Sequence, residues 1–510
     1  MLVRLDVGED TWWFSDARWV DAGEGIQAET RLARGVNIER RVTTAYHGSG
    51  RSHFGLGHIE LINTDGELDE LLFAIAAAGG AEAWLYQGDD ATLLASMTLI
   101  ARAKIDRPKS QGESFLRLVC IDGAAELRKA IITTRFSSGP LDGQLLPVLL
   151  GTGWSIPSVA ADPPNLRFAT HHASGLTTHR VRNRGALLTK GSAWDDYSAG
   201  EIHGHVMTTG IGDNARITCD ATAPAFGSYD ADSLPGIVGA LVEGLIGWDA
   251  SRIDYDGLEA LATELGDPTF GIWYAGPVEA SRILDDIAAS IGGWWYVDLL
   301  GVLRMDRLRV PSGEPVLHLT ETELRGEVTV DMDTMPGLSD AVLGLRNAYV
   351  HAASELGESV QGSDIGATLQ RAFRHRAPFA VHPVYQRAES RRAAASTPQA
   401  SDAVDADNDD SGMPTMLADT ASVDAEAARR EEIAAVPGWW IEATAELTAV
   451  DAATLLPGTL VAVTVTDLRS DAPRLRLDAL LATVMVVTAE AGDGRAKLVL
   501  RAMDEPEEEK

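Results

Sequence analysis

Residues 57–72, GHIELINTDGELDELL, decide how the first part of the chain folds. The oxygen-bearing side chains around Gly66 suggest a calcium loop, but an EF-hand with that glycine at position 6 places Leu61 at position 1 and Leu72 at position 12. Leucine cannot bind a hard cation, so no metal site is expected. The stretch instead predicts a strand over 58–61, a polar Asn-Thr-Asp-Gly turn, and a helix that starts where leucines recur at helical spacing.

Length and composition are those of a multidomain globular protein. The 510 residues predict three or four domains, and the chain is 45% apolar and 23% charged. Its cysteines, Cys120 and Cys219, are too few for a disulfide framework or a cysteine-based zinc site. The N-terminus has no signal-peptide core, and the most apolar run, 479–487, is too short to span a bilayer. We therefore expect a soluble protein made in the cytoplasm, with no membrane-spanning segment.

The net charge of −32 argues against general nucleic-acid binding, because 43 basic residues face 75 acidic ones. A local basic patch exists at Arg167, His179, Arg180, Arg182 and Arg184. Most of the surface should nevertheless repel DNA, which would suit a protein past which DNA must slide.

The pattern along the chain predicts a mainly β protein with an α+β insertion. Residues 1–144 read as a first β-barrel domain, with strands at 95–103 and 115–122 separated by a turn at 108–113. Residues 145–225 form a β-rich module, and 226–325 an α+β domain with helices at 234–245 and 279–291 and a hairpin at 294–305. Residues 326–505 read as a second β-barrel domain. Its acidic segment, about 389–411, lacks bulky apolar residues and is therefore predicted to be a flexible loop. A helix is predicted at 421–435.

Three groups of residues are candidates for a functional site. His203 and His205 share a strand face with His171, His172 and His179 nearby, but no metalloenzyme motif accompanies them, so a strand edge is favoured over zinc. The acidic pairs Asp285-Asp286 and Asp331/Asp333 arise by chance in so acidic a chain, so no catalytic residue and no cofactor is predicted. The third group consists of adjacent tryptophans, in which one member of each pair is expected in the core and the other at an interface; glycan binding is the weaker alternative. These residues are Trp12, Trp13, Trp294, Trp295, Trp439 and Trp440.

Several segments, in order, resemble the tail hub or baseplate hub proteins of tailed bacteriophages. They are FGLGHIELINTDGELDELL (54–72), LLPVLLGTGWSIPSV (145–159), VRNRGALLTKGSAWDDY (181–197), IAASIGGWWYVDLLGVLRMDRLRVPSGEP (287–315), LLPGTLVAVT (455–464) and ALLATVMVVTAEAGDGRAKLVLRA (479–502). The similarity spans nearly the whole chain. The histidine-rich stretch 165–179 and the long segment 389–411 depart from the family's pattern.

This resemblance implies two small barrels like those of tail tubes, flanking the β-rich module and an α+β hub domain. It also implies a non-enzymatic virion protein of the tail tip, assembled in the host cytoplasm as a homotrimer. The trimer would adapt a six-fold tube to three-fold tip components and line the channel through which DNA is ejected. The implied partners are a distal tail or tail tube protein, the tape measure protein, and tip fibre or spike proteins. A peptidoglycan-cleaving hydrolase and a glycan-binding tail protein remain the alternatives.

Overall fold

The computed structural model describes most of the chain. The described residues are 1–34, 37–43, 51–88, 92–111, 114–121, 123–212, 214–332, 340–379, 412–435, 439–447, 455–465, 475–490, 495–503 and 507–508. The acidic segment 389–411 that was expected to form a flexible loop lies outside them. Within the described residues the protein is mainly β with an α+β unit, which confirms the predicted fold class.

The N-terminal sheet has seven strands in the order β2-β1-β9-β10-β11-β8-β5. Their bounds are β1 (Leu2–Val7), β2 (Asp10–Ser15), β5 (Leu32–Arg34), β8 (His58–Ile62), β9 (Ala81–Gln87), β10 (Thr98–Gln111) and β11 (Phe115–Ile121). The segment just before β5 bridges the two edges of the sheet. Ser15 N donates to Glu29 O of this segment (2.8 Å), and Ile62 N of β8 donates to Arg31 O (2.7 Å). The sheet therefore nearly closes into a barrel, and helix α1 (Asp69–Ala78) packs against its core through Leu71 and Ile75.

The quoted stretch folds as predicted, as strand β8, a turn and helix α1. The expected turn at 108–113 is wrong over 108–111, because β10 continues through Pro108 to Gln111, and residues 112 and 113 lie outside the described residues. Pairing with β9 stops at Ile105, so the far half of β10 is bonded on the β11 side alone. A proline is tolerated at such a free edge because it removes no ladder hydrogen bond there. The expected strand at 95–103 is also shorter at its start, where a 3₁₀ turn occupies Leu94–Ser96.

The inserted module is built from two sheets. One has the order β16-β15-β19-β12-β20 and the other β13-β14-β18-β17. The strands are β12 (Val148–Pro157), β13 (Val159–Asp162), β14 (Arg167–His171), β15 (Thr177–Asn183), β16 (Ala186–Leu188), β17 (Trp194–Ala199), β18 (Ile202–Met207), β19 (Ile217–Thr222) and β20 (Gly271–Tyr274). Because β20 belongs to the central unit, its pairing with β12 ties the module to the rest of the chain.

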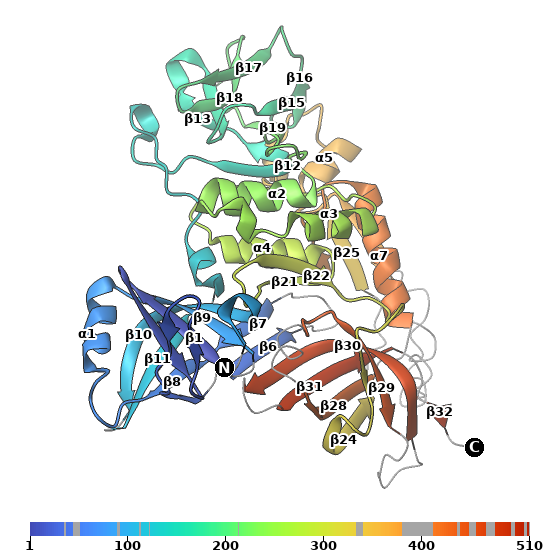
Figure 1. Cartoon of the computed structure of the whole chain (residues 1–510). Helices are drawn as coiled ribbons and strands as arrows, with labels where there is room; N and C mark the ends of the chain where they lie inside the picture. The colour runs from blue at the N-terminus through green and yellow to red at the C-terminus, as the bar shows by residue number, and fades with distance from the viewer. Residues whose placement is uncertain are drawn as a thin grey trace.

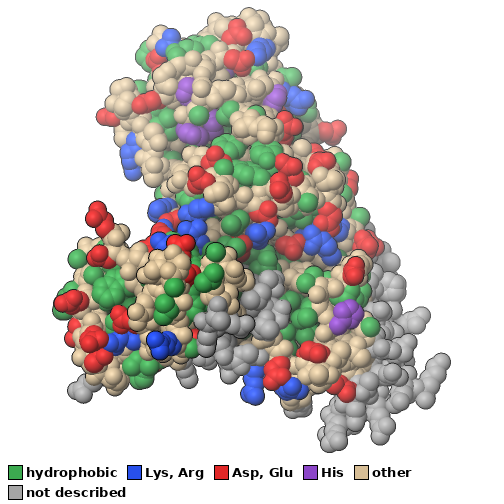
Figure 2. Space-filling view, viewed as in Figure 1, with side chains coloured by type: hydrophobic (Ala, Val, Ile, Leu, Met, Phe, Trp, Pro, Cys, Tyr) green, Lys and Arg blue, Asp and Glu red, His purple; other side chains and the backbone are tan. Residues whose placement is uncertain are grey.

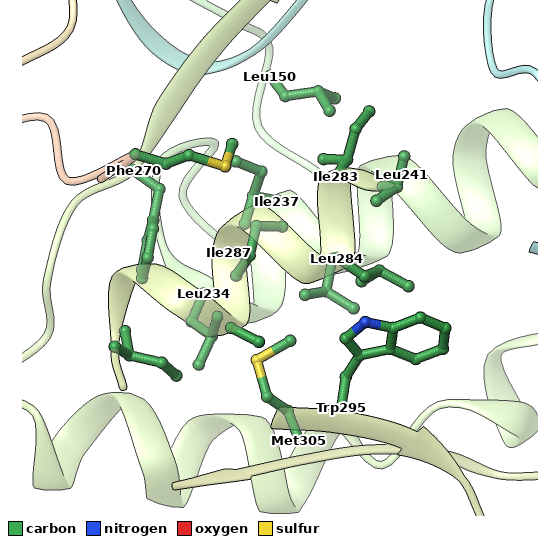
Figure 3. Packing of buried hydrophobic residues seen from close by; sticks show 14 of the residues in the cluster. Leu150, Leu234, Ile237, Leu241, Phe270, Ile283, Leu284, Ile287, Trp295 and Met305 are labelled. Atoms are coloured by element: carbon green, nitrogen blue, oxygen red, sulfur yellow. The ribbon is translucent and has the colours of Figure 1, made fainter. Parts of the chain in front are cut away.

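The central unit surrounds the largest apolar core of the described residues. It contains α2 (Leu234–Gly239) continued by a π-helical segment (Ala240–Ile246), α3 (Tyr255–Glu264), α4 (Ala280–Ser290), α5 (Asp364–Leu369), α7 (Thr420–Ala435), β21 (Gly293–Val297), β22 (Leu303–Arg307), β25 (Asp340–Gly344), β26 (His375–Phe379) and β27 (Met413–Pro414). Figure 3 shows Ile283, Leu284 and Ile287 of α4 packed with Trp295 and Met305 of the β21–β22 hairpin. The predicted helices at 234–245, 279–291 and 421–435 and the predicted hairpin are confirmed.

The C-terminal sheet is built around the long strand β30. Its strands are β23 (Leu317–Leu319), β24 (Leu324–Met332), β28 (Trp439–Glu446), β29 (Leu460–Val465), β30 (Leu475–Glu490), β31 (Arg495–Ala502) and β32 (Glu507–Glu508). They curve around their own apolar cluster as a second barrel-like sheet. In Figure 1 this sheet and the N-terminal barrel lie side by side at one end of the molecule, with the inserted module at the opposite end and the central unit between.

Candidate functional site: the joint between the two barrels

A hairpin from the N-terminal part of the chain joins the C-terminal sheet. It consists of β6 (Asn37–Thr43) and β7 (Arg51–Leu56), which follow β5 in sequence. Strand β6 pairs antiparallel with β30, from Asn37 opposite Glu490 to Arg41 opposite Val486, and β7 meets β21 at Trp295. One eleven-stranded sheet therefore runs from the central hairpin, through this N-terminal hairpin, into the C-terminal barrel. The two barrels are linked by backbone hydrogen bonds as well as by the chain itself.

The hairpin is anchored by Arg40, whose side chain is fully buried. Its Nη1 donates to the carbonyl oxygen of Leu455 at 2.6 Å. Burial lowers the pKa of Arg40 to about 10, while the nearby Tyr296 and Asp298 act in the opposite direction. A buried guanidinium is costly unless it is hydrogen-bonded. A shift of the hairpin would separate Arg40 from Leu455 and leave its charge without this hydrogen bond.

Apolar side chains seal the joint. Trp294 is completely buried here, with Tyr296 from the same strand, Val42 of the hairpin and Met485 of the C-terminal sheet. Trp440 packs at the edge of this cluster, and the guanidinium of Arg501 lies 5.6 Å from the centre of its ring. The cluster therefore contains side chains from three parts of the chain and fixes their relative positions.

The structure brings together two of the tryptophans singled out from the sequence, Trp294 and Trp440. Trp12 packs against the core of the N-terminal barrel, whereas Trp13 lies outside it against Trp19, with ring centres 6.4 Å apart. Trp439 packs against the C-terminal core. Trp294 makes its contacts within the chain. Contacts of the other tryptophans with a second subunit remain a prediction.

The acidic turn at 63–67 is occupied by a side chain of the protein. The guanidinium of Arg31 binds Asp65 in bidentate fashion, at 2.8 and 2.7 Å, and also contacts Glu29 and Glu67. The hydrogen bonds from Arg31 hold the pKa of Asp65 at about 2. The carboxylates that suggested a calcium loop therefore bind the guanidinium of Arg31. The sequence of the loop alone contains no signal for this role.

Three of these histidines, His171, His203 and His205, are buried in the module, whereas His172 is half-buried and His179 is exposed. His171 and His205 are buried, and burial lowers the pKa of each to about 3. His171 Nδ1 accepts a hydrogen bond from Leu149 N at 3.0 Å, and His203 Nδ1 shares one with Ser198 Oγ at 2.8 Å. Among the described residues, no group of three or more histidine, cysteine or acidic side chains is arranged to hold a metal ion.

The paired carboxylates do not converge on one point. Asp285 accepts a hydrogen bond from the indole of Trp295 (2.9 Å), whereas Asp286 pairs with Arg282 one turn earlier on α4 (3.4 Å). Burial raises the pKa of Asp286. Asp331 lies in β24, and Asp333 lies outside the described residues.

Charged side chains of both signs are interspersed over the face shown in Figure 2. None of the helices in the described ranges combines the length and the apolar character needed to cross a membrane.

Comparison with known proteins gives distant likenesses among solved structures. No family model and no curated protein matches the sequence. Among solved structures, the chain is similar to the crystal structure of the 43 kDa tail protein of prophage MuSo2 from Shewanella oneidensis. The match has a TM-score of 0.37 and 9% sequence identity, and covers 98% of this chain and 95% of that one.

Proposed function

We propose that this chain is a structural hub protein of a phage tail tip or baseplate. The observation that carries the proposal is the pair of barrel-like sheets, held side by side at one end of the molecule by the β6–β7 hairpin (Figure 1). The ordered series of hub-like segments along the sequence supports the same assignment. No catalytic role is part of the proposal.

Two barrels per chain provide a way to match two symmetries. Three chains with two barrels each present six barrels, so a three-fold ring can dock on a six-fold tube. Such a ring closes through heterologous contacts, in which one surface of a subunit meets a different surface of the next. The requirement is that both barrels keep a fixed relative position, and the backbone pairing of β6 with β30, together with the buried cluster around Trp294, supplies this rigidity.

The net charge of −32 supports a role around a DNA channel. Protein surfaces bind duplex DNA chiefly by neutralising phosphates with basic side chains, and an acidic bore offers few such contacts. Electrostatic repulsion would therefore allow DNA to pass without being held. The proposed neighbours are a tail tube or distal tail protein, a tape measure protein and fibre or spike proteins of the tip.

The test is the mass of the purified protein in solution, measured by light scattering over a range of concentrations, alone and with a tail tube protein. The proposal predicts a species of three times the 54.4 kDa chain mass. A protein that stays monomeric under both conditions contradicts it. Clearing of a cell-wall suspension that is lost in Asp285→Asn would instead support the hydrolase alternative, and retention on a glycan array that is lost in Trp440→Ala would support glycan binding.

A further inference from the structure

We propose that a pocket between the inserted module and the α5 segment binds an oxyanion, a phosphate or carboxylate group carried on a small organic molecule. The pocket is about 650 Å³, within the usual range for small-molecule sites. Its lining includes the guanidinium groups of Arg180, Arg182 and Arg374, and none of the described residues that line it is acidic. This site is separate from the barrel joint and goes beyond the hub function.

Strand geometry places two of the arginines together. Arg180 and Arg182 are two residues apart on β15, so their side chains leave the same face of the sheet. The neighbouring strand places Asp220 directly opposite Arg180. Arg374 approaches from the segment before β26, where its Nε donates to Asn347 Oδ1 at 2.8 Å and its guanidinium lies 4.7 Å from the centre of the Trp154 ring.

The three arginines share one buried carboxylate. Asp220 binds Arg182 with both oxygens at 2.7 Å, and lies 3.8 Å from Arg374 and 4.0 Å from Arg180. Asp220 also accepts from Ser155 N, so its oxygens are already engaged. Three positive charges against one negative charge leave a local charge of about +2 in a chain whose net charge is −32.

Arg374 lies farther from the shared carboxylate than Arg182 does, at 3.8 Å against 2.7 Å. Burial lowers the pKa of Arg374 to about 10, Asp220 opposes this effect, and Arg182 and Arg180 add to it. An anion in the pocket would offset this repulsion and the loss of hydration. Arginine is well suited to this task because its planar fork matches the oxygens of phosphate and carboxylate groups.

The remaining lining indicates what carries the anion. Hydroxyl groups come from Ser359, Ser363 and Thr368. Those of Ser363 and Thr368 donate to Val360 O (2.7 Å) and Asp364 O (2.9 Å), so toward a ligand they act as acceptors. The lining also includes two exposed apolar side chains, Leu187 (65% exposed) and Ile365 (60% exposed). A ligand with one charged group, further hydroxyl groups and a small apolar face would complement this surface, as a sugar phosphate or a sugar acid does.

The walls of the pocket are held together independently of a ligand. Arg184, in the turn after β15, donates to the carbonyl oxygens of Ser354, Glu355 and Leu356 at 3.1–3.3 Å. Leu356, Val360 and Leu369 form a small apolar cluster beneath the same turn. The site is therefore preformed, which lowers the entropic cost of binding.

Calorimetric titration of the full chain at low ionic strength tests the proposal. The probes are inorganic phosphate, glucose 6-phosphate and glucuronate, with glucose as the neutral control. We expect glucose 6-phosphate or glucuronate to bind more tightly than glucose, and the tighter of the two identifies the anion as phosphate or carboxylate. Inorganic phosphate should compete with the bound sugar anion.

Each variant of this test changes a side chain at the surface. Arg180→Gln, which is 56% exposed, should weaken binding about tenfold, because it removes one charged donor without disturbing the buried pair. Leu187→Glu adds a carboxylate at the rim and should weaken binding as well. The matched control is Arg216→Gln, which is 61% exposed and pairs with Glu355 instead. Absence of binding by every anion, or equal weakening in Arg180→Gln and Arg216→Gln, would overturn the proposal.

Discussion

Acidification is predicted to destabilise the inserted module through His171 and His205. Both rings are buried and neutral in the folded chain, and burial lowers their pKa values from 6.5 to about 3. At a pH between about 3 and 6.5, these two histidines bind protons in the unfolded chain but not in the folded chain. The histidine contribution to stability is therefore complete above pH 6.5 and is lost as the pH falls below that value.

The size of the loss follows from the difference in proton binding. At about pH 5 an unfolded histidine of pKa 6.5 gains ~2 kcal/mol from protonation, and the folded ring gains almost nothing. The two rings together therefore reduce the free energy of unfolding by ~4 kcal/mol, a large part of the ~5–15 kcal/mol typical of a domain. Protonation of His171 would also remove the acceptor for Leu149 N, which opposes protonation in the folded state.

Hydrogen–deuterium exchange of β14 and β18, corrected for intrinsic exchange rates at about pH 8 and about pH 5, measures this loss locally. His205→Phe is the decisive variant. Its ring would stack on Phe168, 5.3 Å away, and no hydrogen bond is lost because neither ring nitrogen of His205 has a partner in the described structure. The variant should recover ~2 kcal/mol of the acid-induced loss. His179→Gln, which changes an exposed histidine of the same module, is the matched control. An unchanged pH dependence in His205→Phe would refute the reasoning.

Three further changes probe other parts of the structure. Trp294→Ala should lower the free energy of unfolding by ~3–5 kcal/mol, because it empties a fully buried site at the barrel joint. Urea denaturation measures this free energy, and a loss below ~1 kcal/mol would show that the joint is not a packed core. Arg31→Gln should raise the pKa of Asp65 from about 2, measured by NMR titration, and calcium should leave the thermal stability of the wild type unchanged; a stoichiometric ion at this turn would contradict the assignment. Glu426→Gln should cost ~3–5 kcal/mol because it leaves the buried Arg430 without its carboxylate, and thermal unfolding with little change would show that the pair is dispensable.

The elements with strong local patterns could be predicted from the sequence. Helix α4 repeats apolar residues at helical spacing, and the β21–β22 hairpin has apolar strands on both sides of a Gly-containing turn. The strand–turn–helix at 58–78 followed from the same local reasoning, because Gly66, with φ of 76°, adopts the left-handed conformation that such a turn favours.

Contacts between distant parts of the chain could not be predicted. Residues 37–43 lie within 1–144, the range predicted to form the first barrel, yet β6 pairs with β30, and Arg40 reaches Leu455, 415 residues away. Alternating side chains define a strand but do not identify its neighbour. The same applies to Arg31, whose position beside the acidic turn depends on the closure of the barrel. The basic residues of β15 were visible in the sequence, but their convergence with Arg374 depends on tertiary structure.

A density map of the purified protein assembled with a tail tube protein tests the hub assignment most directly. The account predicts a three-fold ring in which each chain contributes two adjacent barrels, so that six barrels surround a central bore, with β6 paired to β30 inside each chain. A ring without two barrels per chain facing the tube, or an assembly with no central bore, would contradict it.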